Sequence, residues 1–396
     1  MSGPLEGIRV LEVANFIAGP YAGLLLADLG AEVIKIENPD GGDPFRGWQY
    51  GGDQPTFWAY NRGKKSVILN LRTDEGKEVL RRLARRADVL LENQRPGVMD
   101  RLGVGSAQLM AINPRLIYCS VTGFGPTGPY AGYPAYDGIG QAYSGLVSML
   151  LVDPEHPQPV GPNFSDSLSA MFGTFGILGA LVARDRTGRG QRVDTSLVGA
   201  TLAFINAPAT EVLAGGPIQG PKSRPIASQT YCWTCKDGLS LTVHLSSPPK
   251  FWEGLAKSAG RPELIEDPRF RTQGDRRSHY DELRDELAPS FATRPRDEWL
   301  AVMREHDVPC APNYNLAEVF EDPQIRHMRL LRTIERGGRP AIRTVGCPVD
   351  FSDTAPPHPA PPPEYGEHTD EVLAGVGYAP AEIDALRAKG VIAPSA

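Results

Sequence analysis

Residues 8–37 read IRVLEVANFIAGPYAGLLLADLGAEVIKIE, and this stretch decides the fold. Residues 8–14 are rich in β-branched and apolar side chains and follow a glycine, which is typical of a strand. Residues 20–29 form a helix-like run that stops at a glycine, and residues 32–37 again favour a strand. A strand, a helix and a second strand in this order predict a parallel sheet with helices packed against it.

The same alternation continues through the first third of the chain. Further strand-like runs cover residues 66–71, 88–93 and 116–121, and helical segments separate them. We therefore expect a large α/β domain of Rossmann-like type, with a parallel sheet covered by helices on both faces.

The character of the sequence changes near residue 218. Residues 231–243 alternate around the turn Lys236-Asp-Gly238, which predicts a hairpin, and amphipathic helices follow it. This indicates a smaller α+β domain. We place the large domain at residues 1–200, completed by 325–396, the linker at 201–225 and the small domain at 226–324.

The composition is that of a soluble globular protein, with 41% hydrophobic and 22% charged residues. The formal net charge of −6 gives no reason to expect a nucleic acid or an anionic membrane as partner. The first residues lack the pattern of a secretory signal, and no run reaches the ~18 apolar residues of a membrane-spanning helix. We therefore expect a cytoplasmic protein.

The five cysteines are scattered, which suits a reducing compartment. Cys232 and Cys235 form a C-x-x-C pair, but they lie in a strand-like stretch, whereas redox pairs open a helix. A zinc site would need a second pair of Cys or His ligands at similar spacing, and the sequence has none. We expect neither a redox site nor a bound metal.

Residues 123–128, Gly-Phe-Gly-Pro-Thr-Gly, match the G-x-G-x-x-G pattern of dinucleotide-binding proteins. That pattern requires a helix to begin there, with its N-terminus facing the pyrophosphate. Pro126 and Pro129 indicate a loop instead, which argues against a nicotinamide or flavin dehydrogenase. Basic residues gather in loops at predicted strand ends, where they are either phosphate ligands or solvated charges: Arg46, Arg62, Lys64, Lys65, Arg95 and Arg101.

Asp166 can be interpreted in two ways. It lies just before the apolar, glycine-rich segment 170–183, which favours a helix. Asp is among the commonest helix-capping residues, so Asp166 is either a cap or a nucleophile. In the second case the helix N-terminus holds the carboxylate ionised for acyl transfer through a covalent intermediate, and helix-terminal N–H groups stabilise the oxyanions.

Several segments together resemble the class III CoA-transferase family, which includes formyl-CoA and carnitine CoA-transferases, the bile-acid-inducible enzymes and α-methylacyl-CoA racemase. The resemblance spans nearly the whole chain and rests on the order and spacing of short motifs. They are Leu5-Glu-Gly-Ile-Arg-Val-Leu-Glu-Val13, Leu29-Gly-Ala-Glu-Val-Ile-Lys-Ile-Glu37, Asn61-Arg-Gly-Lys-Lys-Ser-Val67, Glu92-Asn-Gln-Arg-Pro-Gly97, Tyr136-Asp-Gly-Ile-Gly-Gln-Ala142, Thr187-Gly-Arg-Gly-Gln191 and Gly366-Glu-His-Thr-Asp-Glu-Val-Leu373.

The resemblance implies a transferase that moves CoA from an acyl-CoA thioester to a carboxylic acid. Asp166 would be the nucleophile and form an aspartyl-CoA thioester, and the large domain would bind CoA. Coenzyme A and acyl-CoA would be substrates, and no permanent cofactor is implied. The implied CoA contacts are Asn15, Phe16, Ala18, Asn93, Arg101 and Tyr136. Where some family members have basic residues, this chain has Asn38, Thr122 and Pro134, so its phosphate contacts differ in part.

Two alternatives stay open. α-Methylacyl-CoA racemase shares the fold, but its acid/base pair is supplied by an aspartate together with a His-Asp dipeptide, and at the position of that dipeptide this chain has Tyr136-Asp137. A tyrosine, with an ordinary pKa near ~10, is a poor base at neutral pH. The other alternative is a non-catalytic acyl-CoA-binding protein, which would not need Asp166.

The resemblance also implies an interlocked homodimer, in which each chain forms an open ring threaded by the other. Two connections, residues 200–225 and 325–365, are rich in proline and glycine, and the entropy of closing such loops grows only slowly with length. We expect apolar segments such as 197–213 to be buried against the partner.

Overall fold

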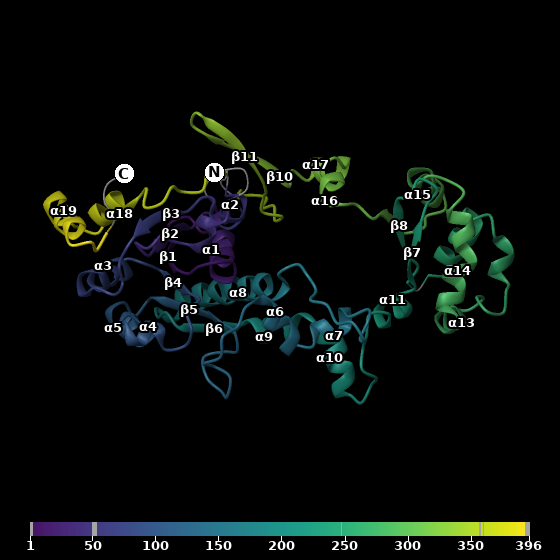
Figure 1. Cartoon of the computed structure of the whole chain (residues 1–396), viewed down its shortest axis with the longest axis horizontal. Helices are drawn as coiled ribbons and strands as arrows, with labels where there is room; N and C mark the ends of the chain where they lie inside the picture. The colour runs from purple at the N-terminus through teal and green to yellow at the C-terminus, as the bar shows by residue number, and fades with distance from the viewer. Residues whose placement is uncertain (1–2, 50–53, 247, 356–357, 359, 393–396) are drawn as a thin grey trace. The chain divides into compact units, whose positions relative to one another are not determined.

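The structure is a computed structural model that describes residues 3–49, 54–246, 248–355, 358 and 360–392 (Figure 1). The chain divides into two compact units. Unit 1 comprises Met1–Val147, Pro159–Ala209 and Arg326–Ala396, and unit 2 comprises Ser148–Gln158 and Thr210–Ile325.

Unit 1 is built on a six-stranded parallel sheet with the strand order β3-β2-β1-β4-β5-β6. The strands are β1 (Arg9–Val13), β2 (Glu32–Glu37), β3 (Lys65–Ile68), β4 (Val89–Glu92), β5 (Ile117–Thr122) and β6 (Arg192–Ser196). This confirms the predicted α/β fold with a parallel sheet. The strand order reverses between β1 and β4, and ligands of open α/β sheets bind at the carboxyl ends of the strands on either side of such a reversal.

Helices connect these strands and cover both faces of the sheet. In chain order they are α1 (Ala18–Asp28), η1 (Pro44–Gly47), α2 (Pro55–Asn61), α3 (Asp74–Ala84), α4 (Val98–Arg101), α5 (Ser106–Ile112), α6 (Asp137–Tyr143), α7 (Leu146–Leu150), α8 (Phe164–Thr187), α9 (Leu197–Phe204) and α10 (Asn206–Leu213). Helices α9 and α10 follow the last strand of the sheet, and α7 and α10 extend into unit 2. The hairpin β10 (Leu331–Arg336) and β11 (Arg339–Val345) and the helices α18 (Thr369–Gly375) and α19 (Pro380–Ala388) complete unit 1. The predicted linker, 201–225, contains α10 and parts of its neighbouring helices.

The sheet separates two apolar cores. Leu11 of β1 packs in a core that also takes side chains from α3, α5, α18 and α19, whereas its neighbour Val10 packs in a core with α1 and α8. Successive side chains of a strand point to opposite faces, so β1 contributes to both cores. Because both faces are covered, the central residues Val10 and Leu11 are both apolar, and the buried charge of Glu12 is paired with lysines.

Helix α8 is the longest helix of unit 1 among the described residues, with 24 residues. By length and composition alone it is the one described helix that could cross a membrane, which the sequence expectation did not anticipate. One face, including Ala170 and Ile177, is buried in the core with α1 and the sheet. The opposite face exposes Met171, Phe175 and Val182 in this single chain. A core helix of a globular protein passes the same test of length and composition.

Unit 2 has a three-stranded antiparallel sheet of β7 (Thr230–Thr234), β8 (Ser240–His244) and β9 (Cys310–Pro312). The predicted hairpin is confirmed, because Tyr231 pairs with Val243 and Gly238 takes the left-handed φ of +78° in the turn. Its helices are α11 (Ser223–Ser228), α12 (Pro249–Ser258), η2 (Pro262–Ile265), α13 (Gln273–Ser278), α14 (Tyr280–Phe291), α15 (Arg296–Glu305), α16 (Leu316–Val319) and α17 (Pro323–His327), the last of which continues into unit 1.

Candidate active site

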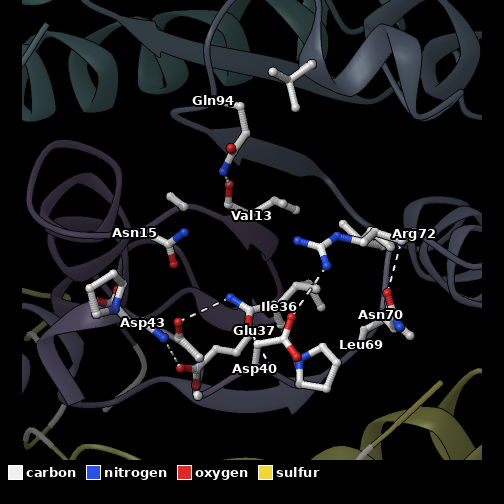
Figure 2. Close-up of a pocket in the computed structure, with 18 of the residues that line it drawn as sticks. Val13, Asn15, Ile36, Glu37, Asp40, Asp43, Leu69, Asn70, Arg72 and Gln94 are labelled. Carbon is white, nitrogen blue, oxygen red and sulfur yellow. Dashed lines mark hydrogen bonds and ion pairs between the residues drawn. The ribbon is translucent and has the colours of Figure 1, made fainter. Parts of the chain in front are cut away.

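Two clefts of unit 1 open at the carboxyl ends of β1 and β4, where the strand order reverses. The larger cleft has a volume of about 680 Å³ and also takes in the ends of β2 and β3 (Figure 2). The smaller cleft, of about 200 Å³, takes in the end of β5 and the start of α8. Asn15 and Gln94 line both clefts, so the two spaces are neighbours.

The turn between β1 and α1 forms a shared wall of the clefts and is held rigidly. Asn93 accepts the N–H of Asn15 with Oδ1 at 3.1 Å and donates from Nδ2 to the Asn15 carbonyl at 2.8 Å. Phe16 follows with a φ of +63°. A non-glycine residue in this region costs roughly 1–3 kcal/mol, and such strain gathers at functional sites.

A fully buried network of charges lies beneath this turn. Lys35 Nζ is 2.9 Å from Glu12 Oε1 and 2.9 Å from Asp43 Oδ2. It also donates to the Ala14 carbonyl at 2.8 Å, directly before Asn15. Lys64 pairs with the other oxygen of Glu12 at 2.7 Å, and burial lowers the pKa of Lys64 to about 8. Because a buried charge without its partner is costly, this network keeps the turn in one position.

Three of the basic loop residues considered as phosphate ligands form ion pairs with carboxylates of unit 1 instead: Lys64 with Glu12, Arg62 with Asp28 and Arg46 with Glu37. Arg72, which sequence reasoning missed, lines the larger cleft at its exposed mouth. Its guanidinium lies 3.5 Å from Asp40, and Figure 2 shows it reaching toward that carboxylate. An exposed ion pair of this kind contributes little to stability.

Asp166 lies in the first turn of α8 and lines the smaller cleft. The helix begins at Phe164, upstream of the expected start, so Asp166 is inside the helix rather than ahead of it. Tyr136 lines the same cleft, with 67% of its surface exposed. The ring of Tyr136 packs edge-on against that of Phe16, with 5.9 Å between the ring centres. Three segments distant in sequence thus meet around one carboxylate.

Asp166 does not cap the helix, because Asp137 does so. Oδ1 of Asp137 accepts the backbone N–H of Ser165 at 2.8 Å and of Asp166 at 3.2 Å. The next N–H, of Ser167, donates to the Asn163 carbonyl. The expected oxyanion donors at this helix terminus are therefore already occupied. Sequence reasoning missed Asp137 as the cap because it lies 28 and 29 residues before its partners.

Contrary to expectation, the helix N-terminus does not keep the pKa of Asp166 low. Burial, and then the negative charge of Asp137, raise the pKa of Asp166 to about 7. The helix dipole favours the anion by only ~0.3–1 kcal/mol at an exposed site. Loss of hydration and a nearby like charge outweigh it here.

Comparisons with known proteins identify the family of this chain. The model of CoA-transferase family III matches residues 5–369. The chain belongs to this family. Acetyl-CoA:oxalate CoA-transferase from Acetobacter aceti is 38% identical over 91% of this chain and 92% of that protein. Succinate–glutarate CoA-transferase from Agrobacterium fabrum is 34% identical over 94% and 95%, respectively. The crystal structure of a CAIB/BAIF family protein from Brucella suis is 33% identical, with a TM-score of 0.84 over 95% of this chain and 100% of that one.

The structure of this family III protein brings together most of the residues expected at the site. Asn15, Phe16, Ala18, Asn93, Tyr136 and Asp166 all line the smaller cleft. Arg101 lines neither cleft and is exposed at the end of α4, although its neighbours Met99 and Leu102 line the larger one. Of the three positions without a basic residue, Asn38 lines the larger cleft, Thr122 lines the smaller cleft and Pro134 lines neither.

Proposed function

We propose that this family III protein is an acyl-CoA:carboxylate CoA-transferase with Asp166 as its nucleophile. The observation that carries the proposal is the position of Asp166, a carboxylate of raised pKa in a cleft at the switch point of the sheet. Relatives named as CoA-transferases match more than nine-tenths of the chain, which supports the class of reaction.

In the proposed reaction, an oxygen of ionised Asp166 attacks the carbonyl carbon of the acyl-CoA thioester. The C–S bond breaks, CoA leaves as a thiolate, and a mixed anhydride joins Asp166 to the acyl group. The thiolate then attacks the Asp166 carbonyl carbon, and the donor acid leaves with the bridging oxygen. The acceptor carboxylate attacks the resulting aspartyl-CoA thioester and runs the same steps in reverse. Thioesters and anhydrides are exchanged throughout, so the covalent route needs no external energy source.

Backbone N–H groups at the start of α1 are the proposed donors to the oxyanions. The N–H groups of Ile17 and Ala18 have no acceptor among the described residues, and both residues line the cleft of Asp166. Their helix terminus carries a partial positive charge. Fixed N–H donors aimed at developing negative charge are the most effective stabilisers of acyl-transfer intermediates. The rigid turn before them keeps these donors in place.

The two clefts accommodate the two ends of CoA in this proposal. The nucleotide would occupy the larger cleft, where Arg72 meets a phosphate. The thioester would enter the smaller cleft, past Asn15 and Phe16, to reach Asp166. Arg101 would contact CoA only where the ligand extends beyond the rim of the larger cleft.

The racemase alternative is disfavoured by the contacts of Asp137. Both carboxylate oxygens of Asp137 accept hydrogen bonds, from the start of α8 and from Gln141. Asp137 is therefore committed to holding a helix, and Tyr136 beside it is a poor base. Proton exchange at the α-carbon of a 2-methylacyl-CoA in deuterated water should accordingly be negligible beside acyl transfer. A non-catalytic binding protein would show neither reaction.

We also propose that the protein is a cytoplasmic homodimer. In the single chain α8 exposes Met171, Phe175 and Val182, and α9 exposes Leu202 and Phe204. Exposed apolar side chains gathered on neighbouring helices mark interaction surfaces. A second copy of the chain is the partner that the family resemblance implies. All five cysteines are free, which suits a reducing compartment.

The experiment that tests the function is a transfer assay with several acyl-CoA donors and acids. Succinyl-CoA and acetyl-CoA are offered with dicarboxylic and monocarboxylic acids, and new acyl-CoA species are read by mass spectrometry. Asp166→Ala should abolish transfer, while Asp185→Ala, at the exposed far end of the same helix, should leave it unchanged. Transfer retained in folded Asp166→Ala protein would refute the proposal.

A further inference from the structure

Asp137 reaches the start of α8 from the first residue of α6. The bonds from Ser165 and Asp166 both end on its Oδ1 atom. The residue in the ordinary capping position, Asn163, makes no capping bond with its side chain. Its Nδ2 instead donates to Tyr60 and to another side chain of α8. A residue of another helix therefore does the capping.

Gln141, one turn further along α6, holds the second oxygen of Asp137. Its Nε2 donates to Asp137 Oδ2 at 2.5 Å and to the Pro162 carbonyl at 3.1 Å. Gln141 is only 1% exposed, and its Oε1 has no partner among the described residues. The Asp137 carboxylate is thus held at both oxygens, so its side chain cannot rotate away from α8 without breaking these partly buried hydrogen bonds.

We propose that Asp137 is the positioning residue for the nucleophile. Its two bonds to backbone N–H groups fix the first turn of α8, and with it the direction in which the Asp166 carboxylate enters the smaller cleft. The inference rests on the proposed role of Asp166. Asp137 itself does not line that cleft, so it acts through Asp166 and not on the substrate. Small displacements of a reacting group cost large factors in rate, which is why a fixed first turn matters.

The charge of Asp137 has a second effect on the same residue. The other titratable or charged groups near Asp166 are Tyr60, Tyr136 and Arg95. Asp137 is the group whose negative charge repels that of ionised Asp166. A like charge disfavours ionisation of Asp166. A more basic carboxylate is also a better nucleophile once it is ionised. Asp137 therefore makes ionised Asp166 a stronger nucleophile, but it also lowers the ionised fraction of Asp166, and with it the activity, at low pH.

Two substitutions distinguish the effect of Asp137 on the position of Asp166 from the effect of its charge. Asp137→Asn keeps an oxygen that can accept both N–H groups but removes the charge, and Gln141 can turn its unpartnered Oε1 toward the new amide. Asp137→Ala removes both the acceptor and the charge. Asp185→Asn removes a charge from the exposed end of α8 and serves as the control. The readouts are kcat, KM for acyl-CoA and the pH profile of kcat/KM, with Asp166→Ala measured alongside.

For Asp137→Asn we expect the acid limb of the profile to move to lower pH, with kcat at pH ~8 within about threefold of wild type. For Asp137→Ala we expect kcat to fall about tenfold to hundredfold with KM little changed. The control should match wild type. Equal loss of kcat in both variants of Asp137, or an unmoved acid limb in Asp137→Asn, would overturn the inference.

Folding and the role of Asp166 are checked separately. If Asp137→Ala does not fold, the pH profile and kcat of Asp137→Asn decide alone. An inactive Asp166→Ala protein beside Asp137 variants that behave as wild type would overturn the positioning role only. An active Asp166→Ala protein would overturn the proposed function and this inference together.

Discussion

Asn93 binds the backbone of Asn15 at both its N–H and its carbonyl, at 3.1 and 2.8 Å. We expect Asn93→Ala to lower stability by about 1–3 kcal/mol, because two partly buried backbone groups lose their partner. KM for acyl-CoA should rise about tenfold, since the turn lines both proposed CoA clefts. Urea denaturation and steady-state kinetics measure the two effects.

Asn113 offers a matched control for this prediction. Its Nδ2 donates to the carbonyls of Ala84 and Ala87, both at 2.9 Å, and it lines neither cleft. Asn113→Ala should therefore lower stability by a similar amount and leave KM unchanged. An equal rise of KM in both variants would mean that the Asn93 effect is one of general stability.

The positive φ of Phe16 predicts an inverted order of stability between glycine and alanine. At most positions glycine is less stable than alanine by ~0.5–1 kcal/mol. At a φ of +63° alanine keeps the strain and glycine does not, so Phe16→Gly should be at least as stable as Phe16→Ala. Both variants lose the ring contacts with Phe45 and Tyr136 and should bind acyl-CoA more weakly. Thermal unfolding of the two purified variants checks the order, and a clearly more stable Phe16→Ala would contradict it.

The raised pKa of Asp166 makes stability depend on pH in a defined direction. The carboxyl has a pKa of about 7 in the fold and near 3.8 when unfolded. The folded state therefore holds the proton more tightly, and stability falls as pH rises from about 4 to about 7. Asp166→Asn removes this cost, so it should be more stable than wild type at pH ~8, by at most roughly 4 kcal/mol. The difference should vanish below pH ~4, as urea denaturation at several pH values would show. A constant difference across this range would contradict the assignment.

Sequence patterns predicted the elements of the fold but not the contacts across it. Strand β2 covers the same residues, 32–37, that its apolar pattern predicts, because burial of the strand fixes the period of that pattern. The buried pair of Lys35 and Glu12, and the cap that Asp137 supplies, join residues far apart in sequence. No local pattern marks such pairs. The raised pKa of Asp166 was missed for the same reason, because Asp137 lies far from it in sequence.

The exposed face of α8 predicts how the protein assembles. Phe175 is 74% exposed in the single chain, between Met171 and Val182. If a second copy covers this face, Phe175→Asp should weaken or abolish the dimer, because a charge would be buried in an apolar contact. Leu316→Asp, an exposed position on α16, is the comparison variant. Mass photometry at nanomolar concentration measures both, and an unchanged dimer in Phe175→Asp would place the contact elsewhere.

The measurement that tests the central claim most directly follows an oxygen atom from the acceptor acid into the protein. The acceptor carboxylate attacks the aspartyl-CoA thioester, and the bridging oxygen of the anhydride stays with Asp166 when CoA takes the acyl group. Turnover with an acceptor acid labelled with heavy oxygen should therefore label the Asp166 carboxylate, as peptide mass spectrometry would show. The other aspartates, Asp137 included, should stay unlabelled. Full transfer activity with no label in Asp166 would contradict a covalent mechanism at this residue.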